Sequence, residues 1–156
     1  MTDHLQSLLD ALGWDDDVDH DDDGISRVDT SFVIGGLAFG LTLWLDPVAC
    51  WFHILLVSPV SVDDDQHAAA LALCNEVNNG LAFGRFSVRN TRVNFKHGVD
   101  YEGVVDPLPL MQTAFTAAAS SVEARHPGFM RLLPGAKAGS VNEPAPGSSG
   151  PQLLLN

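Results

Sequence analysis

The stretch that decides the fold is residues 37–57, LAFGLTLWLDPVACWFHILLV. Apolar side chains take every second position in its first half, which is the period that places them on one face of a β-strand. Asp46 and Pro47 then interrupt the alternation and predict a turn before a second strand over residues 49–57. The core-facing positions are expected to be Leu37, Phe39, Leu41, Leu43 and Leu45 on the first strand, and Cys50, Phe52, Ile54 and Leu56 on the second.

The opposite face of these two strands is apolar as well. Trp51, Leu55 and Val57 surround His53 on the second strand, and Trp44 lies on the same face of the first. A sheet with one solvated face carries polar side chains there, so we expect this second face to be covered. Three covers stay open at this stage: the N-terminal helix, a second subunit, or a segment of a client protein.

Working outward, the chain predicts an α+β domain with an antiparallel sheet flanked by helices. The helix over residues 3–12 precedes a strand over 25–34, and Gly35-Gly36 predicts the hairpin turn into the central stretch. Ser61, with Asp64 three residues later, predicts the start of a helix that runs to Asn79. A hairpin over residues 81–89 and 92–101 follows, and then a helix that starts at Asp106-Pro107 and weakens or ends at Pro127-Gly128. The predicted order is α-β-β-β-α-β-β-α.

The domain is expected to span residues 1–133. Residues 134–156 are rich in Pro, Gly and Ser and predict a disordered tail, although Leu153-Leu154-Leu155 offers an apolar end that could dock on the domain.

The net charge of −12 is concentrated in two short runs. Without the seven aspartates of residues 15–23 the charge is −5, and without Asp63–Asp65 as well it is −2. With eight Lys and Arg in the whole chain, nucleic-acid binding is not expected. No apolar run reaches the ~20 residues of a membrane span. The N-terminus lacks a basic signal-peptide region, and Cys50 and Cys74 are expected to be buried free thiols. These features predict a cytoplasmic protein.

The acidic run raises one alternative, a calcium site. Asp19, Asp21 and Asp23 occupy positions 1, 3 and 5 of an EF-hand-like loop, with Gly24 at position 6. Position 12, where a bidentate glutamate should close the coordination shell, is Thr30. The run is therefore interpreted chiefly as a solvated connector, with calcium binding as the alternative.

No pattern in the chain predicts catalysis or a cofactor. The six histidines form no metal-binding pair, and Cys50 and His53 would lie on opposite faces of a strand. Arg85, between Gly84 and Phe86, is interpreted either as a surface residue that pairs with an acid or as a contact to a client. Asn75 and Asn78 are expected to satisfy backbone groups at the end of their helix.

The element order resembles that of a known family, and so do the stretches LALCNEVNNGLAFGRFSV (71–88) and VNFKHGVDYEGVVDPLPLMQTAF (93–115). The resemblance is to the YbjN-like family, bacterial sensory transduction regulators grouped with the type III secretion chaperone-like fold, and it covers residues 3–133. It implies a small, acidic, usually dimeric protein without catalytic residues. Secretion chaperones of this fold hold an extended client polypeptide against apolar surface, and YbjN-like proteins are linked to regulation and stress responses.

Together these observations predict a non-enzymatic module that forms a homodimer and binds a protein client or regulatory partner. The residues expected to contact the partner are Trp44, Trp51, His53, Leu55, Val57 and Arg85.

Overall fold

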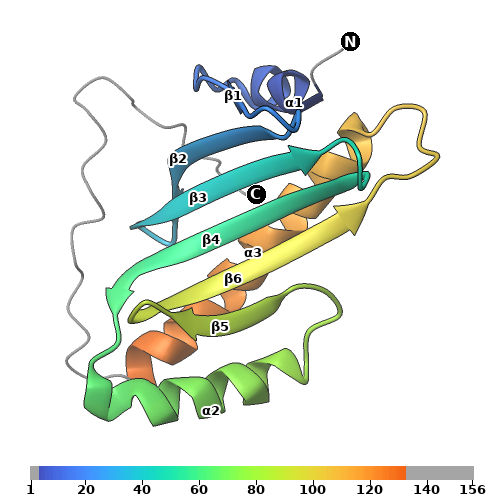
Figure 1. The fold of residues 1–156 in the computed structure, drawn as a ribbon. Helices are drawn as coiled ribbons and strands as arrows, with labels where there is room; N and C mark the ends of the chain where they lie inside the picture. Colours follow the sequence, from blue (N-terminus) through green and yellow to red (C-terminus); the bar gives the residue numbers. More distant parts are fainter. Residues whose placement is uncertain (1–3, 133–156) are drawn as a thin grey trace.

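The structure is a computed structural model that describes residues 4–132. Its elements follow in the order α1 (His4–Leu12), β1 (Asp19–His20), β2 (Ser26–Ile34), β3 (Leu37–Asp46), β4 (Trp51–Ser61), the 3-10 helix η1 (Asp64–Gln66), α2 (His67–Asn78), β5 (Arg85–Arg89), β6 (Arg92–Asp100) and α3 (Leu108–Leu132). The strands form a six-stranded antiparallel sheet in the order β1-β2-β3-β4-β6-β5 (Figure 1). The predicted α+β class is confirmed, and the two-residue strand β1 is an addition to the predicted order.

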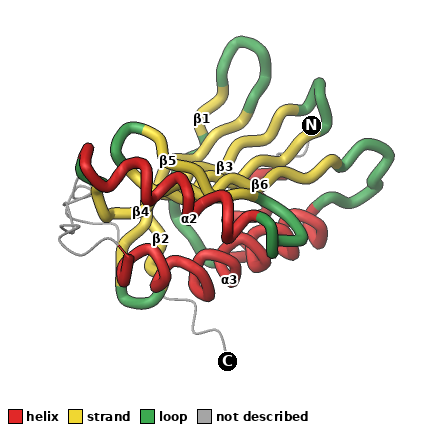
Figure 2. The backbone as a smooth tube through the Cα atoms, turned by 90° about the horizontal axis from the view of Figure 1, so that it is seen from below, coloured by secondary structure: helices red, strands yellow, loops and turns green. Residues whose placement is uncertain are grey.

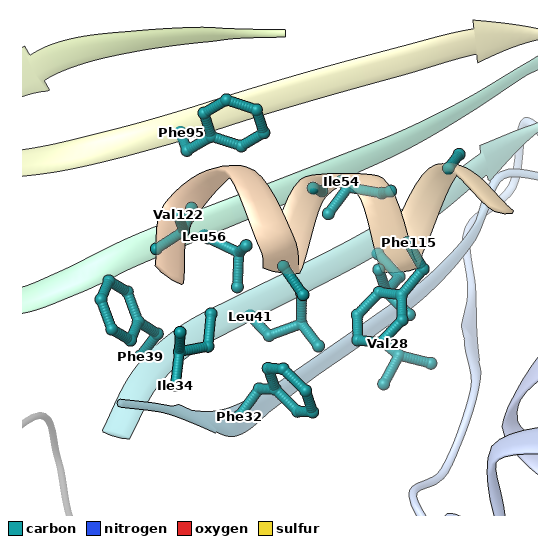
Figure 3. Packing of buried hydrophobic residues seen from close by; sticks show 14 of the residues in the cluster. Val28, Phe32, Ile34, Phe39, Leu41, Ile54, Leu56, Phe95, Phe115 and Val122 are labelled. Carbon is teal, nitrogen blue, oxygen red and sulfur yellow. The ribbon is translucent and has the colours of Figure 1, made fainter. Parts of the chain in front are cut away.

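The helices lie on one side of the sheet. Figure 2 shows α2 and α3 together on that side, and Figure 1 shows α3 crossing behind the strands. The inner side chains of β2, β3 and β4 pack against the buried stripe of α3, including Phe115 and Val122 (Figure 3). The core therefore lies between the inner face of the sheet and α3.

The N-terminal helix α1 joins this same core. Leu5, Leu8 and Leu9 are completely buried in it. Trp14, just beyond the helix, packs on Phe115 with ring centroids 5.5 Å apart. Because α1 contacts α3, it does not fold across the opposite face of the sheet, and that option for covering the face is wrong.

Strand β4 continues further than predicted and ends in a bulge. Its pairing with β6 shifts register between Val57 and Ser61, and Pro59 falls in that irregular segment, where a missing ladder N–H is tolerated. Ser61 is therefore a strand residue and not the start of a helix, which corrects the prediction. The helical turn begins instead after Asp63, whose backbone N–H donates to Gln66 Oε1 at 3.4 Å.

Helix α3 also runs past its predicted end, through Pro127 to Leu132. Pro127 removes one helical hydrogen bond, but the next turn buries Phe129 against Phe86, with ring centroids 5.2 Å apart. His126 Nε2 lies 2.8 Å from Ser58 Oγ in the β4 bulge. These tertiary contacts hold the last turn of the helix in place.

Two further predictions need correction. Cys50 lies in the turn before β4 with φ 55° and is half-buried, so it is not a core-facing strand residue. The Asp46 carboxylate accepts hydrogen bonds from the N–H groups of Val48 and Ala49. These bonds lengthen the turn, so that the strand begins only at Trp51.

Asn78 exchanges two hydrogen bonds with the backbone of Phe86 in β5, not with the helix end.

The predicted tail, residues 134–156 with Leu153-Leu154-Leu155, lies outside the described residues. None of the helices between residues 4 and 132 is long and apolar enough to cross a membrane.

Candidate functional site

The sheet side that faces away from α3 is called the outer face here, and it carries the side chains that the sequence singled out. Alternation along β4 buries Phe52, Ile54 and Leu56 on the inner side and directs Trp51, His53, Leu55 and Val57 outward. Trp44 of β3 pairs directly with His53 across the strands. Among residues 4–132, no helix lies over this face (Figure 1).

Two tryptophan rings sandwich His53. Its imidazole stacks on Trp44 at a centroid distance of 4.6 Å and an interplanar angle of 21°, and on Trp51 at 5.6 Å and 17°. Trp51 is nevertheless 39% exposed. Flat rings held parallel on a strand surface form a rigid apolar platform, because stacked aromatic pairs are favourable beyond their buried area.

Gly98 of β6 makes this stack possible. It pairs with His53, and a Cβ atom at this position would lie 2.9 Å from His53 Nδ1 and 3.3 Å from Trp51 Cε3. The imidazole therefore lies over bare backbone, where its buried Nδ1 has no hydrogen-bond partner among the described residues. Burial lowers the pKa of His53, and the nearby Lys96 ammonium lowers it further, while Asp46 opposes the shift.

Cations border the platform on the β6 and β5 side. Lys96 Nζ lies 5.0 Å from the centre of the Trp44 ring, a cation–π geometry. Arg85, exposed at the start of β5, pairs with Lys96. Arg85 and Lys96 line one hollow of about 400 Å³ together with Trp51 and His53, so the structure brings Arg85 to the same surface as the aromatic residues.

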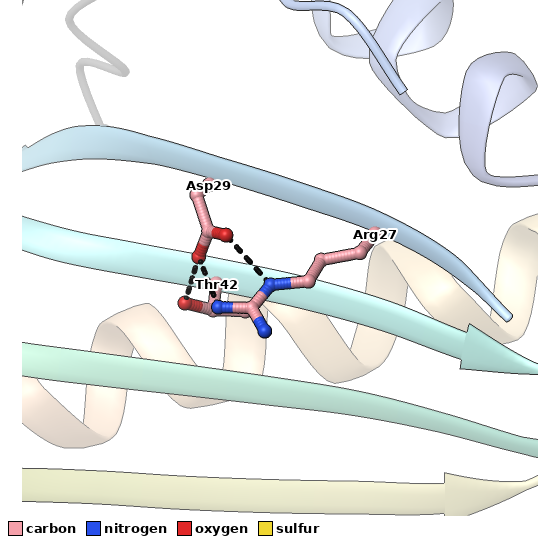
Figure 4. A network of polar contacts seen from close by, with 3 residues as sticks. All are labelled: Arg27, Asp29 and Thr42. Atoms are coloured by element: carbon pink, nitrogen blue, oxygen red, sulfur yellow. Dashed lines mark hydrogen bonds and ion pairs between the residues drawn. The ribbon is translucent and has the colours of Figure 1, made fainter. Parts of the chain in front are cut away.

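A polar cluster borders the platform on the β2 side. The Arg27 guanidinium donates to both carboxylate oxygens of Asp29, at 2.6 and 3.0 Å, and the Thr42 hydroxyl donates to the same carboxylate (Figure 4). Burial raises the pKa of Asp29, but these hydrogen bonds and the Arg27 charge outweigh it and leave the pKa lowered. The apolar centre of the face is thus rimmed by charged groups, the usual anatomy of a protein interface.

The acidic connector folds against this rim as a turn. Asp21 Oδ1 accepts the N–H groups of Asp23 and Ile25, and β1 pairs Asp19 with Arg27. Asp19 and Asp21 line a second hollow of about 510 Å³ with Arg27, Trp44 and Leu55. Within residues 4–132 no group of three or more His, Cys, Asp and Glu side chains could hold a metal ion, so the calcium alternative gains no support.

A possible catalytic pair lies elsewhere, in the core. Ser58 Oγ and His126 Nε2 are 2.8 Å apart, but both residues are buried and Ser58 Oγ already accepts the N–H of Val60. Burial lowers the pKa of His126. This hydrogen bond fastens α3 to the bulge of β4 and offers no access to a substrate.

Sequence reasoning missed the contribution of β6 to the face. Lys96, Gly98 and Asp100 alternate along this strand, and each pairs with an outer-face residue of β4. A glycine inside a strand pattern often marks a close approach of another group, and Gly98 was the available signal.

Comparisons with known proteins follow the fold. The family model YbjN, described as "Putative bacterial sensory transduction regulator", matches residues 2–125. None of the curated proteins compared matches the chain. The solved structure titled "Crystal Structure of the ExsC-ExsE Complex" is similar with a TM-score of 0.53 at 14% identity, over 86% of this chain and 93% of that one.

Two further solved structures align less closely. They are "Structure of the HopA1-SchA Chaperone-Effector Complex" (TM-score 0.45, 14% identity, 77% of this chain and 90% of that one) and "Crystal structure of YbjN, a putative transcription regulator from E. coli" (TM-score 0.48, 10% identity, 80% and 90%). At 14% identity, the likeness to the structure of the ExsC-ExsE complex concerns the fold alone.

Proposed function

Since this chain belongs to the YbjN family, we propose that it is a non-enzymatic protein-interaction module, chaperone-like or regulatory, which binds a polypeptide partner on the outer face. The observation that carries the proposal is the platform of Trp44, His53 and Trp51, an apolar surface on the side of the sheet away from the helices. Large uncovered apolar patches on a sheet mark sites of protein interaction.

The composition of the face supports a protein partner over a small molecule. Aromatic residues form its centre, and Arg27, Lys96 and Arg85 stand at its borders. Trp and Arg are the side chains that dominate binding energy at protein interfaces. The two hollows beside the platform are open to solvent, whereas small-molecule sites enclose most of their ligand.

The test compares two variants that gain the same charge. Leu55→Asp places a carboxylate at the centre of the outer face, and Ala124→Asp places one on the exposed side of α3. Each is used as bait in an extract of the native host, and thermal unfolding verifies that both are folded. We expect Leu55→Asp to lose proteins that the wild type and Ala124→Asp retain. Equal capture by all three chains would contradict the proposal.

We further propose that the protein works in the cytoplasm and as a homodimer. The acidic composition and the family support this assignment. Fractionation of host cells, with a tagged chain followed by immunoblotting, tests the compartment.

A further inference from the structure

Four of the eight Lys and Arg residues of this acidic chain lie on one hairpin, formed by β5 and β6. Arg85 pairs with Lys96 across the two strands, and Arg89 pairs with Arg92. Phe86, next to Arg85, is buried in the core, so the alternation along the strands directs the four cations to the outer face. We call this surface the cationic patch. Its outward residues are Arg85, Ser87 and Arg89 of β5, and Arg92, Asn94 and Lys96 of β6.

The two cationic pairs are unfavourable for the sheet itself. Like charges directly opposite each other on neighbouring strands destabilise the pairing. Within residues 4–132 none of the four cations forms an ion pair with a carboxylate. Arg92 donates to the carbonyl oxygen of Ser58 at 3.1 Å, and Lys96 lies over the Trp44 ring. The described part of the chain therefore does not neutralise the patch.

A polar row separates the two cationic rows. Asn94 pairs with Ser87 in this row. Asn94 is 7% exposed, and its Oδ1 atom is buried without a hydrogen-bond partner among residues 4–132. A buried acceptor without a donor is costly. The N–H groups of a polypeptide backbone laid over this row are donors of the kind that the Asn94 oxygen requires.

The rows also set the spacing of the anions that fit. Side chains two residues apart on a strand are separated by ~7 Å, so the two cationic rows lie ~13 Å apart. In an extended polypeptide, side chains four residues apart share a face and are separated by the same ~13 Å. Two carboxylates at this spacing therefore meet one pair of cations each.

The charge changes sign further along β6. Two residues beyond Lys96, Gly98 lies beside His53 of the aromatic platform, and two residues further Asp100 is exposed. A segment that continues past Lys96 therefore meets an apolar surface and then a carboxylate. A single-stranded nucleic acid carries a phosphate at every residue and would set one against Asp100. A polypeptide avoids this repulsion, because its acids are confined to one end.

We propose that the cationic patch is the docking site for an acidic stretch of the partner polypeptide. This stretch is extended and carries two Asp or Glu residues four positions apart, with an apolar residue two positions beyond one of them that lies on the platform. The inference rests on the proposed function, in that it names the chemistry of the partner that the outer face binds. Charge complementarity selects this partner, since each acid meets two cations that have no carboxylate within residues 4–132.

A synthetic peptide array, incubated with the purified full chain, tests the spacing. The peptides have a background of Thr and Val, with two glutamates at spacings from three to six residues and a leucine two positions beyond the second. A spacing of four should retain at least about fivefold more protein than spacings of three and five, in which the second glutamate points away from the patch. Peptides with glutamine in place of both glutamates should retain none.

A double variant tests the patch. Arg85→Gln with Arg89→Gln removes one exposed cation from each row and should weaken the best peptide by about tenfold in fluorescence anisotropy. The matched control, Arg125→Gln with Arg131→Gln, removes two exposed cations from α3 and should leave the dissociation constant unchanged. Thermal unfolding separates binding from folding: because the patch variant loses two like-charge pairs, it should unfold at the wild-type temperature or above.

The inference is overturned if no peptide binds, if the glutamine peptides or all spacings bind equally, or if the patch variant binds like its control or unfolds at a lower temperature. A labelled oligo(dT) that binds more tightly than the best peptide would replace the polypeptide with a nucleic acid. In the host extract, a patch variant that retains the proteins lost by Leu55→Asp would refute the acidic stretch alone and leave the proposed function standing.

Discussion

Replacing Gly84 by alanine should destabilise the fold through a clash in the core. Gly84 has φ +68°, and a Cβ atom there would lie 2.4 Å from Cζ of Phe95 and 3.0 Å from its two Cε atoms. Phe95 is 1% exposed and packs on Phe86 with ring centroids 4.9 Å apart. The ring therefore has little room to move away.

Gly103 provides the matched control. Its φ is +73°, almost the same as at Gly84, but nothing lies within 4 Å of the Cβ position. Both variants carry the strain of an L-residue in the left-handed region, about 1–2 kcal/mol. Both also restrict the unfolded chain equally, so that contribution cancels in the comparison. Only Gly84→Ala adds the cost of overpacking, typically about 1–3 kcal/mol.

We therefore expect a loss of about 1–2 kcal/mol in the free energy of unfolding for Gly103→Ala and of about 2–5 kcal/mol for Gly84→Ala. Urea unfolding followed by tryptophan fluorescence measures both free energies. The comparison is valid if the slope of the unfolding free energy against urea concentration is the same in both variants as in the wild type. If Gly84→Ala costs no more than Gly103→Ala, Phe95 does not pack against this turn as described.

Three other predictions concern buried groups. Ser58→Ala leaves His126 without its buried hydrogen-bond partner and should lower the free energy of unfolding, measured by thermal unfolding, by about 1–3 kcal/mol. A change as small as that of a surface substitution would show that the Ser58–His126 hydrogen bond does not stabilise the fold. Acidification should also destabilise the fold, because burial lowers the pKa values of His97 and His126, so the folded chain binds fewer protons than the unfolded one. This stability is complete above about pH 6.5 and falls as the pH drops toward the folded pKa values; a urea midpoint that stays constant or rises on acidification would contradict it. Burial raises the pKa of Cys74 to about 11. A thiol reagent should therefore modify Cys50 in the folded protein and Cys74 only after unfolding. If both thiols react equally fast in the folded protein, Cys74 is accessible and the prediction is wrong.

Much of the fold was predictable because local chemistry sets it. Gly35-Gly36 and Asn90-Thr91 adopt positive φ in the two predicted hairpin turns, and the alternation of residues 37–57 places inward and outward side chains as expected on β3 and β4. The errors fall where tertiary contacts override local preference. Pro127 indicates a helix end, but burial of Phe129 in the next turn keeps the helix intact.

The candidate site was predictable only in part. Trp44, Trp51 and His53 stood out because apolar side chains on a second sheet face require a cover. Lys96, Gly98 and Asp100 did not, because their place beside His53 depends on the pairing of β4 with β6, two strands some forty residues apart in the chain. Nothing local sets that register.

The sequence by itself determined the order of the elements and the two faces of each central strand, because a period of two residues is a property of the strand alone. It did not determine what covers the second face of β3 and β4, because that face is apolar as well and the N-terminal helix was one of its possible covers. The tertiary structure decided that α1 and α3 share the inner side, where Leu5, Leu8, Leu9 and Phe115 form one core. The helices lie on the side where their apolar stripes are buried completely, and the aromatic platform around His53 is left on the other side.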